Sequence, residues 1–264
     1  MYKLIASDMD GTLLRSDRTI SEDTKNAIKN IKDKGTIFVL CTGRPLIAVE
    51  KYNEMLNLNC PVILYNGAQI FDFASRKILF EKYLDFEYVK FVWDEGCKKK
   101  LEIYIWANNE LYTNFINDKV YDYIVDSHAE IHKLNDIRDL IGKNITKVLW
   151  DEDPDKLKEY MKEFDAIKFY EKVNYCTSMP YYLEFFNLET SKKVAIQKLE
   201  ELYNIKREEV IAIGDGKNDI EMIEYAGLGV AMENATDEVK KYADVIAKSN
   251  NDDGVLEIIK EYIL

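Results

Sequence analysis

The chain has 264 residues, of which 47% are hydrophobic and 32% charged, with 11 Gly and 4 Pro. This composition excludes a collagen-like, low-complexity or intrinsically disordered protein. There are 48 acidic and 36 basic residues, and the formal net charge is −12. Such a charge disfavours nucleic acid as a partner, because binding to a phosphate backbone needs a basic surface. The length accommodates one large domain or two ordinary ones.

The cysteine pattern and the N-terminal sequence favour a cytoplasmic protein. The four cysteines are scattered and contain no CxxC pair, which is typical of a reduced intracellular chain. Asp8 and Asp10 interrupt the first apolar run, so it does not read as a signal peptide. Nothing else approaches the roughly 18 consecutive apolar residues of a membrane span. We therefore expect no membrane partner.

Short apolar runs rich in β-branched residues alternate with helical patterns in the first and last parts of the chain. The clearest runs predict buried strands at residues 4–6, 36–41, 62–65 and 210–213. Between the first two, Ser21 is a candidate N-cap for a helix that ends before Gly35. The pattern predicts an α/β fold, with a Rossmann-like parallel sheet and helices on both faces.

The middle of the chain has a different pattern. It contains all three tryptophans, which we expect to pack in a core, and strand-like runs such as residues 101–106. Apolar and polar residues alternate in these runs, which predicts a sheet with one face exposed to solvent. We therefore expect residues 1–82 and 187–264 to form a discontinuous core, interrupted by an inserted α+β domain at residues 83–186.

Two acidic residues follow the first predicted strand. The alternation of side chains along a strand places Asp8 and Asp10 on the same side, just past its carboxyl end, where open α/β sheets bind ligands. Two carboxylates about 4 Å apart repel by roughly 4 kcal/mol at an effective dielectric constant of 20, so the pair needs a cation or a shared proton. A simple turn is an equally good interpretation of Asp-x-Asp-Gly.

A second acidic group, Asp215 and Asp219, follows the strand predicted at residues 210–213. If both strands are central and parallel, four carboxylates meet at one edge of the sheet. A bound metal ion explains such a concentration of charge, and oxygen ligands from separate strand ends suit Mg²⁺ better than Zn²⁺. His128 and His132 have the i, i+4 spacing of a zinc pair, but the sequence offers no third ligand.

Two further segments could bind an anion. Thr42 and Gly43 precede Pro45, a favourable first helical residue, so the hydroxyl and free amides there could hold a phosphate; an ordinary strand-to-helix turn has the same sequence. Lys192 and Lys193 lie in the first turn of a predicted helix, where each cation is disfavoured by about 0.3–1 kcal/mol. A nearby anion, or exposure to solvent, would compensate them.

Together these segments resemble the motifs of the haloacid dehalogenase superfamily of phosphatases, in particular the Cof-type sugar phosphatases with a type IIB cap. The resemblance spans nearly the whole chain, and its motifs follow the family's order and spacing at residues 8–14, 42–44, 191–192, 214–219 and 229–235. It implies that the inserted domain is a cap that closes over the active site and selects the substrate.

The resemblance implies a catalytic role for the acidic residues. Asp8 is expected to attack phosphorus and form an aspartyl-phosphate, while Asp10 acts as general acid and then as general base. Mg²⁺ would be held by the Asp8 and Asp215 carboxylates and the main-chain carbonyl of Asp10. Asp219 would orient the surroundings of the metal.

It also implies a phosphate-binding set. The residues expected to hold the phosphoryl oxygens are Thr42, Gly43, Lys192 and Asn218. The family usually has Gly after its catalytic lysine, whereas Lys193 follows here; we expect the first of the two lysines to reach the phosphate. This division of labour suits phosphoryl transfer, which chiefly needs alignment and neutralised charge.

The expected function is that of a magnesium-dependent phosphatase that hydrolyses small phosphorylated metabolites, sugar phosphates in the first place. A phosphotransferase or phosphomutase that passes the group to a sugar is one alternative, and a non-catalytic metabolite-binding regulator is another. A nucleotide-dependent enzyme fits less well, since the chain has neither GxxxxGK[ST] nor GxGxxG.

Overall fold

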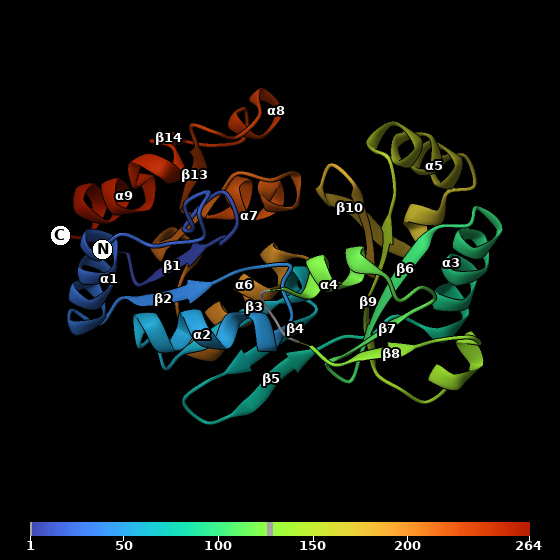
Figure 1. The fold of residues 1–264 in the computed structure, drawn as a ribbon. Helices are drawn as coiled ribbons and strands as arrows, with labels where there is room; N and C mark the ends of the chain where they lie inside the picture. The colour runs from blue at the N-terminus through green and yellow to red at the C-terminus, as the bar shows by residue number, and fades with distance from the viewer. Residues whose placement is uncertain (1, 126–128) are drawn as a thin grey trace. The chain divides into compact units, whose positions relative to one another are not determined.

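The computed structural model describes residues 2–125 and 129–264 (Figure 1). By the contacts they make, these residues form two compact units, each considered by itself below. The first unit comprises the chain up to Gly43, Lys51–Phe80 and Ser191–Leu264, and the second comprises Arg44–Glu50 and Glu81–Thr190.

The first unit contains a five-stranded parallel sheet with the strand order β14-β13-β12-β1-β2. The strands are β1 (Leu4–Ser7), β2 (Ile37–Leu40), β12 (Val210–Gly214), β13 (Leu228–Met232) and β14 (Val245–Ala247). Every residue of β1, β12 and β13 is buried. A parallel sheet covered on both faces explains why the apolar runs that predicted β1, β2 and β12 are continuous rather than alternating.

Helices cover both faces of this sheet. The chain leaves β1 toward β2 in one direction and β12 toward β13 in the other, so right-handed crossovers place the connecting helices on opposite faces. These connecting helices are α1 (Glu22–Asp33) and α7 (Ile220–Tyr225). The α9 helix (Gly254–Tyr262) packs against α1, and α6 (Lys192–Tyr203) packs against α7. Helix α2 (Leu46–Leu56) follows β2 and belongs to this unit from Lys51 onward, and the short α8 (Asp237–Lys240) follows β13.

Helix α1 begins and ends where the sequence predicts. The hydroxyl of Ser21 caps it by accepting the backbone amide of Thr24 at 3.1 Å. Ile28 and Ile31 on its inner face are fully buried. The helix stops before Gly35, whose φ of +91° lies in the left-handed region that glycine adopts without strain.

A small antiparallel sheet follows β2. It consists of β3 (Pro61–Leu64), β4 (Gln69–Asp72) and β5 (Lys77–Glu81). A parallel bridge between Cys41 and Ile63 sets β3 beside the chain that leaves β2. The β3–β4 connection is a single tight turn, Tyr65–Gly67.

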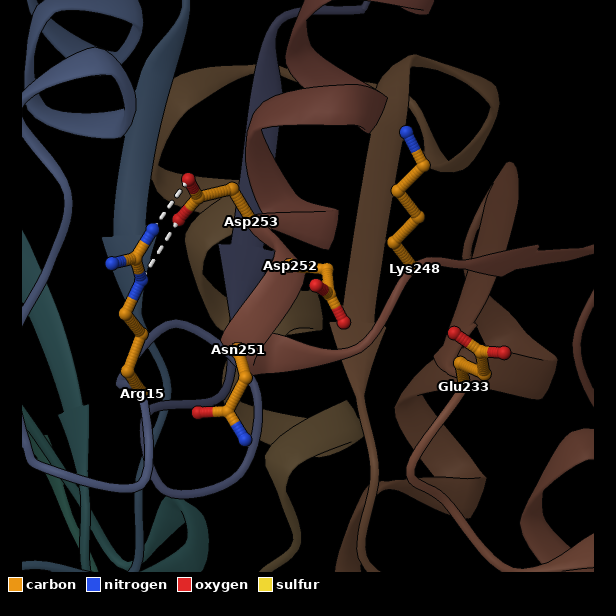
Figure 2. A pocket seen from close by; sticks show the side chains of 6 residues that line it. All are labelled: Arg15, Glu233, Lys248, Asn251, Asp252 and Asp253. Atoms are coloured by element: carbon orange, nitrogen blue, oxygen red, sulfur yellow. Dashed lines mark hydrogen bonds and ion pairs between the residues drawn. The ribbon is translucent and has the colours of Figure 1, made fainter.

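The loop after β1 is fastened by the C-terminal part of the chain. The side-chain amides of Asn234 and Asn250 donate to the carbonyls of Gly11 and Leu14, each at 2.8 Å. Beyond them Arg15 makes two hydrogen bonds with Asp253, at 3.3 and 2.7 Å (Figure 2). A polar pocket of about 560 Å³ lies here, lined by Arg15, Glu233, Lys248, Asn251, Asp252 and Asp253. This anchoring fixes the course of the loop that carries Asp10.

The second unit is a six-stranded sheet with the order β10-β11-β9-β6-β7-β8. Its strands are β6 (Glu102–Ala107), β7 (Glu110–Thr113), β8 (Ile131–Lys133), β9 (Ile145–Asp151), β10 (Val173–Met179) and β11 (Tyr182–Asn187). Helices α3 (Phe86–Lys98) and α5 (Pro154–Ala166) cover one face, with Trp150 and Phe185 in the core between them and the sheet. The predicted combination of a parallel α/β sheet and an inserted α+β part is confirmed.

The expectation that this sheet leaves one face exposed is wrong. Tyr104 and Trp106 point away from α3 and α5, yet they are 0% and 1% exposed. The short helix α4 (Asp118–Ile124) covers them: the ring of Tyr123 stacks on that of Tyr104 at 4.8 Å, and its hydroxyl accepts the indole N–H of Trp106 at 2.8 Å. The prediction that the tryptophans are core residues is confirmed, since Trp93, Trp106 and Trp150 are all buried.

Within the described part of the chain, none of the helices combines the length and the apolar character needed to cross a membrane.

Candidate active site

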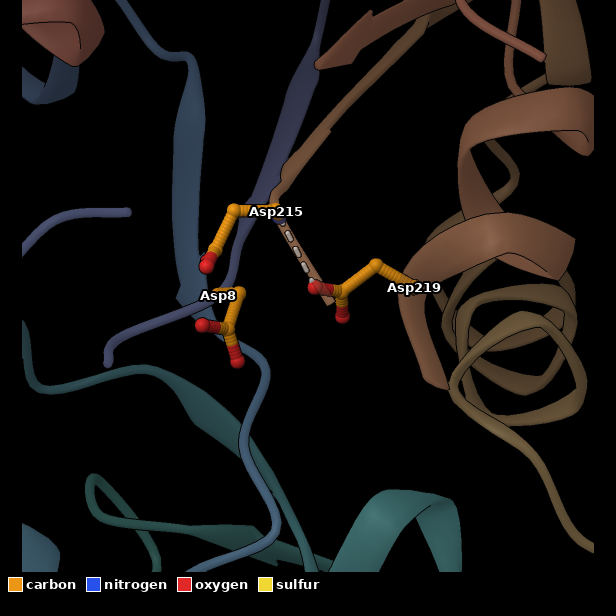
Figure 3. A group of neighbouring side chains, drawn as sticks. All are labelled: Asp8, Asp215 and Asp219. Carbon is orange, nitrogen blue, oxygen red and sulfur yellow. Dashed lines mark hydrogen bonds between the residues drawn. The ribbon is translucent and has the colours of Figure 1, made fainter. Parts of the chain in front are cut away.

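Two neighbouring strands deliver carboxylates to one point. Ser7 at the end of β1 lies opposite Ile213 of β12, and the amide of Asp8 donates to the carbonyl of Ile213 at 2.9 Å. Asp8 and Asp215, each the first residue past its strand, are therefore placed side by side. Together with Asp219 they form a group in which one carboxylate oxygen from each residue lies within 4.8 Å of the others (Figure 3). The expected convergence of β1 and β12 is thus present in the structure.

Lys192 joins this acidic group from the first turn of α6. Its ammonium nitrogen lies 2.5 Å from Oδ1 of Asp8 and 2.6 Å from Oδ1 of Asp219. The side chain is 0% exposed, which for a lysine requires anionic partners. Lys193, by contrast, lies over the ring of Tyr225, 5.7 Å from its centroid. Of the two candidate lysines, the first is the one that the fold brings to Asp8.

Asp219 organises the loop after β12. Its Oδ2 accepts the backbone amides of Asp215 at 3.0 Å and Gly216 at 2.9 Å, while Oδ1 accepts Lys192. The carboxylate is 1% exposed. Asp219 therefore fixes both the turn that presents Asp215 and the position of the lysine, which is consistent with an orienting rather than a reacting group.

The acidic group carries more negative charge than Lys192 alone can offset. Burial and the neighbouring carboxylates of Asp219, Asp215 and Asp10 raise the pKa of Asp8 well above its usual value, against the opposing charge of Lys192. Burial and Asp219 raise the pKa of Asp215 to about 6. The pKa of Lys192 is raised, because the carboxylates of Asp219 and Asp8 outweigh the effect of burial.

The donor set suits a hard divalent cation. A cation between Asp8 and Asp215 would relieve the charge that raises the pKa of both carboxyls. Carboxylate and carbonyl oxygens are the ligands that Mg²⁺ takes in proteins, usually one or two carboxylates with the remaining positions left to water and phosphate. The residues present therefore fit the expected metal.

Thr12 and Gly11, which were not among the predicted site residues, fix and make room for the carboxylate of Asp215. The hydroxyl of Thr12 donates to Oδ1 of Asp215 at 2.6 Å. Gly11 has φ +81°, and a Cβ on it would lie 2.4 Å from Oδ2 of Asp215. Both residues directly follow Asp10 in the first acidic motif, and this adjacency is the feature of the sequence that could have identified them as site residues. What the sequence could not show is that they contact a residue about 200 positions away.

Three of the expected phosphate-binding residues, Thr42, Gly43 and Asn218, lie in two loops joined by Asn66, and the fourth, Lys192, lies in the first turn of α6. The side-chain amide of Asn218 donates to Oδ1 of Asn66 at 3.0 Å, and the backbone amide of Asn66 donates to the carbonyl of Thr42 at 3.0 Å. Gly43 also lies against Asn66, since a Cβ on Gly43 would be 3.0 Å from its Oδ1. Asn66 was not among the predicted site residues. Helix α2 starts at Leu46, so Pro45 precedes the helix instead of being its first residue.

Asp10 and the histidine pair complete the set of sequence candidates. Asp10 is half-buried in the loop after β1, and its charge contributes to the raised pKa of both Asp8 and Asp215. His132 is half-buried, with its ring stacked on Tyr112 at 4.9 Å. His128 lies outside the described residues.

A family model described as haloacid dehalogenase-like hydrolase matches residues 5–259. The chain belongs to this family. Among its curated relatives is the 5-amino-6-(5-phospho-D-ribitylamino)uracil phosphatase YcsE of Bacillus subtilis (strain 168), which is 34% identical over 262 residues, covering 99% of this chain and 96% of the relative. The phosphatase of the same name YitU, from the same organism, is 31% identical over 269 residues, covering 98% and 97%. This haloacid dehalogenase-like hydrolase thus groups with phosphatases.

Solved structures agree with this membership. A haloacid dehalogenase-like hydrolase from Bacteroides thetaiotaomicron is 34% identical, with a TM-score of 0.87 and coverage of 98% of this chain and 99% of that one. The subclass IIB sugar phosphatase BT4131 has a TM-score of 0.86 at 23% identity, with 98% of both chains covered, a likeness that concerns the fold. The predicted family and fold class are confirmed.

Proposed function

We propose that this hydrolase is a Mg²⁺-dependent phosphatase of small phosphorylated metabolites that acts through an aspartyl-phosphate on Asp8. The observation that carries the proposal is the position of Lys192, whose ammonium lies between Asp8 and Asp219 in a buried acidic group. An aspartate is a weak nucleophile toward a phosphate dianion, because the two charges repel. A buried ammonium that contacts the attacking carboxylate lowers this barrier where charge develops.

Asp8 and Asp10 have complementary parts in the proposed reaction. A carboxylate oxygen of Asp8 forms a bond to phosphorus while the bond between phosphorus and the leaving oxygen breaks, and Asp10 gives its proton to that oxygen. Water then attacks the aspartyl-phosphate, Asp10 takes back a proton, and inorganic phosphate leaves with Asp8 regenerated. The half-buried position of Asp10, on an anchored loop, suits a group that must reach both the substrate and water.

The Asp8 and Asp215 carboxylates and the main-chain carbonyl of Asp10 would hold the Mg²⁺. When bound, the ion offsets the charge of the carboxylates and of the phosphoryl group. Thr12 and Asp219 fix the orientation of Asp215, through its Oδ1 and through its backbone amide. Thr42, Gly43, Lys192 and Asn218 would bind the phosphoryl oxygens.

The proposed substrates are phosphate monoesters of sugars and sugar alcohols. Three curated relatives are named for a phospho-ribitylamino compound, and a solved structure of similar fold is named a subclass IIB sugar phosphatase. We assign substrate selection to the second unit, in the role of a cap domain. In the predicted boundaries this cap spans residues 83–186.

A hydrolysis screen tests the proposal. Purified protein is assayed for release of inorganic phosphate from p-nitrophenyl phosphate, a panel of sugar phosphates and 5-amino-6-(5-phospho-D-ribitylamino)uracil, with Mg²⁺ and with a chelator. We expect turnover with Mg²⁺, its loss in chelator, and its loss in Asp8→Asn, while Asp23→Asn on the exposed side of α1 stays active. Full activity in chelator or in Asp8→Asn would refute the mechanism. Transfer to an added sugar without release of phosphate would favour a phosphotransferase instead.

A further inference from the structure

The turn between β3 and β4 has an uncommon backbone. Tyr65, Asn66 and Gly67 have φ values of +50°, +56° and +98°, so three consecutive residues are left-handed. Only Gly adopts this region without cost, and Asn tolerates it better than most residues. Tyr65 and Asn66 are 0% and 1% exposed. Buried non-glycine residues persist in such a conformation only where the surrounding contacts determine it.

The contacts of this turn reach both loops that are proposed to bind phosphate. Asn66 donates its backbone amide to the carbonyl of Thr42 and accepts the side-chain amide of Asn218, each at 3.0 Å. Its side chain also fills the space beside the Cα of Gly43, where a Cβ would lie 3.0 Å from Oδ1 and 3.3 Å from Nδ2. The loops at residues 42–43 and 216–219 are thus connected through one side chain.

The same turn contacts the start of α6. A Cβ on Gly67 would lie 2.1 Å from the carbonyl oxygen of Ser191 and 3.0 Å from the backbone nitrogen of Lys192. The backbone of the turn therefore packs directly against the residue that caps α6. Lys192 is the next residue along the chain, so the turn packs against the backbone that carries the lysine of the site.

We infer that Asn66 is a positioning residue of the phosphate site, which acts through Asn218 and Gly43. Asn66 accepts one N–H of the Asn218 side chain, and this fixes the orientation of the Asn218 amide group. The second N–H of the same nitrogen is then available to a phosphoryl oxygen. By lying against Gly43, Asn66 holds the backbone that carries the adjacent amides. The inference rests on the proposed function, because it assumes that these loops bind the phosphoryl group.

The left-handed backbone of Asn66 makes glycine the substitution that best tests its side chain. Asn66→Gly removes the side chain while keeping a residue that adopts φ +56° without cost, so it tests the side chain alone. Asn204→Gly is the matched control: Asn204 is also left-handed, with φ +52°, but it is exposed at the C-terminal end of α6. Both substitutions make the same chemical change at the same kind of backbone position.

Three measurements on the full-length protein decide the question. Binding of inorganic phosphate in the presence of Mg²⁺ is measured by calorimetry, steady-state kinetics give kcat and KM for p-nitrophenyl phosphate, and thermal unfolding reports the fold. For Asn66→Gly we expect phosphate affinity and kcat/KM to fall by about 10- to 100-fold, the range for one hydrogen bond to a charged group. The unfolding temperature should fall more in Asn66→Gly, whose side chain is buried, than in Asn204→Gly, but both variants should be fully folded at the assay temperature. Asn204→Gly should keep its phosphate affinity and activity.

A double-mutant cycle separates positioning from a general structural effect. If Asn66 acts through Asn218, then Asn66→Gly should reduce phosphate affinity several-fold less in an Asn218→Ala background than in the wild type. Additive losses, or wild-type phosphate affinity in Asn66→Gly, would overturn the inference. A wild-type protein that binds phosphate but does not hydrolyse monoesters would instead refute the proposed function and leave the inference standing.

Discussion

The ammonium of Lys192 lies 2.5 Å from Oδ1 of Asp8, although 184 positions separate the two residues along the chain. Each of these charges is buried with the help of the other. Lys192 has two carboxylate partners, and its positive charge opposes the burial and the neighbouring acids that raise the pKa of Asp8. This pairing determines how the site responds to substitution.

Replacing Lys192 with the similarly sized but uncharged Met should remove both stability and activity. Asp8 and Asp219 would be left buried without their cation, which typically costs about 3–5 kcal/mol, and turnover should fall by at least about 100-fold. Lys193→Met is the control, because that lysine lies over Tyr225. Chemical unfolding and kcat measurements compare the two variants. Loss of activity in Lys193→Met with activity retained in Lys192→Met would show that the wrong lysine has been assigned.

Binding of Mg²⁺ should depend on pH through Asp8 and Asp215, because the pKa of each carboxyl is raised in the folded protein; Asp215 serves here as the example. Its pKa of about 6 lies above the usual value, so without metal the folded protein binds this proton more tightly than the unfolded chain does. The contribution of Asp215 to stability is therefore lost as the pH rises through about 6, and a bound cation restores it. We expect Mg²⁺ to raise the unfolding temperature more at pH 7.5 than at pH 5.5.

Calorimetry in buffers of different ionisation enthalpy should detect proton release on Mg²⁺ binding near pH 6. Asp215→Asn should abolish both the release and the thermal shift. An equal thermal shift at the two pH values would contradict this linkage.

Gly11→Ala should displace Asp215 as well as strain the backbone. Gly11 and Gly35 both have positive φ, but a Cβ would meet Asp215 at 2.4 Å in the first case and nothing within 4 Å in the second. Each substitution should cost about 1 kcal/mol or more through its backbone. Only Gly11→Ala should also weaken Mg²⁺ binding and lower kcat, by about 10-fold or more. Equal loss of Mg²⁺ affinity in Gly35→Ala would rule out the proposed contact as the cause.

The second unit contains a buried ion pair, and we expect the loss of one partner to cost more stability than the loss of both. Lys147 and Glu184 lie 2.9 Å apart with side chains 3% and 4% exposed. Lys147→Met should destabilise the fold by about 3–5 kcal/mol, because it leaves Glu184 buried and uncompensated. The double variant Lys147→Met/Glu184→Leu should recover much of that loss in urea unfolding. An additive second loss in the double variant would argue against uncompensated charge as the cause.

An exposed pair provides the comparison. Lys158 and Asp155 lie 2.8 Å apart, but their side chains are 69% and 88% exposed. Lys158→Met should leave the urea midpoint unchanged, because water already solvates both charges.

Much of the fold could be predicted because it depends on local pattern. Continuous apolar runs predicted β1, β2 and β12, and the Ser21 cap with Gly35 predicted the limits of α1, since burial and capping are properties of short segments. The expectation of an exposed face in the inserted sheet was wrong because exposure depends on segments that lie elsewhere in the chain. Whether Tyr104 is exposed depends on α4, which starts more than ten residues further along the chain.

For the site, the sequence alone determined which chemical groups are available and that acids follow two strand ends. The tertiary structure decided which groups meet. The adjacency of β1 and β12 brought Asp215 to Asp8, the packing of α6 selected Lys192 over Lys193, and a left-handed turn placed Asn66 between the phosphate-binding loops. Such contacts join residues up to about 200 positions apart, and their geometry comes from strand order and helix packing, which local propensity does not encode.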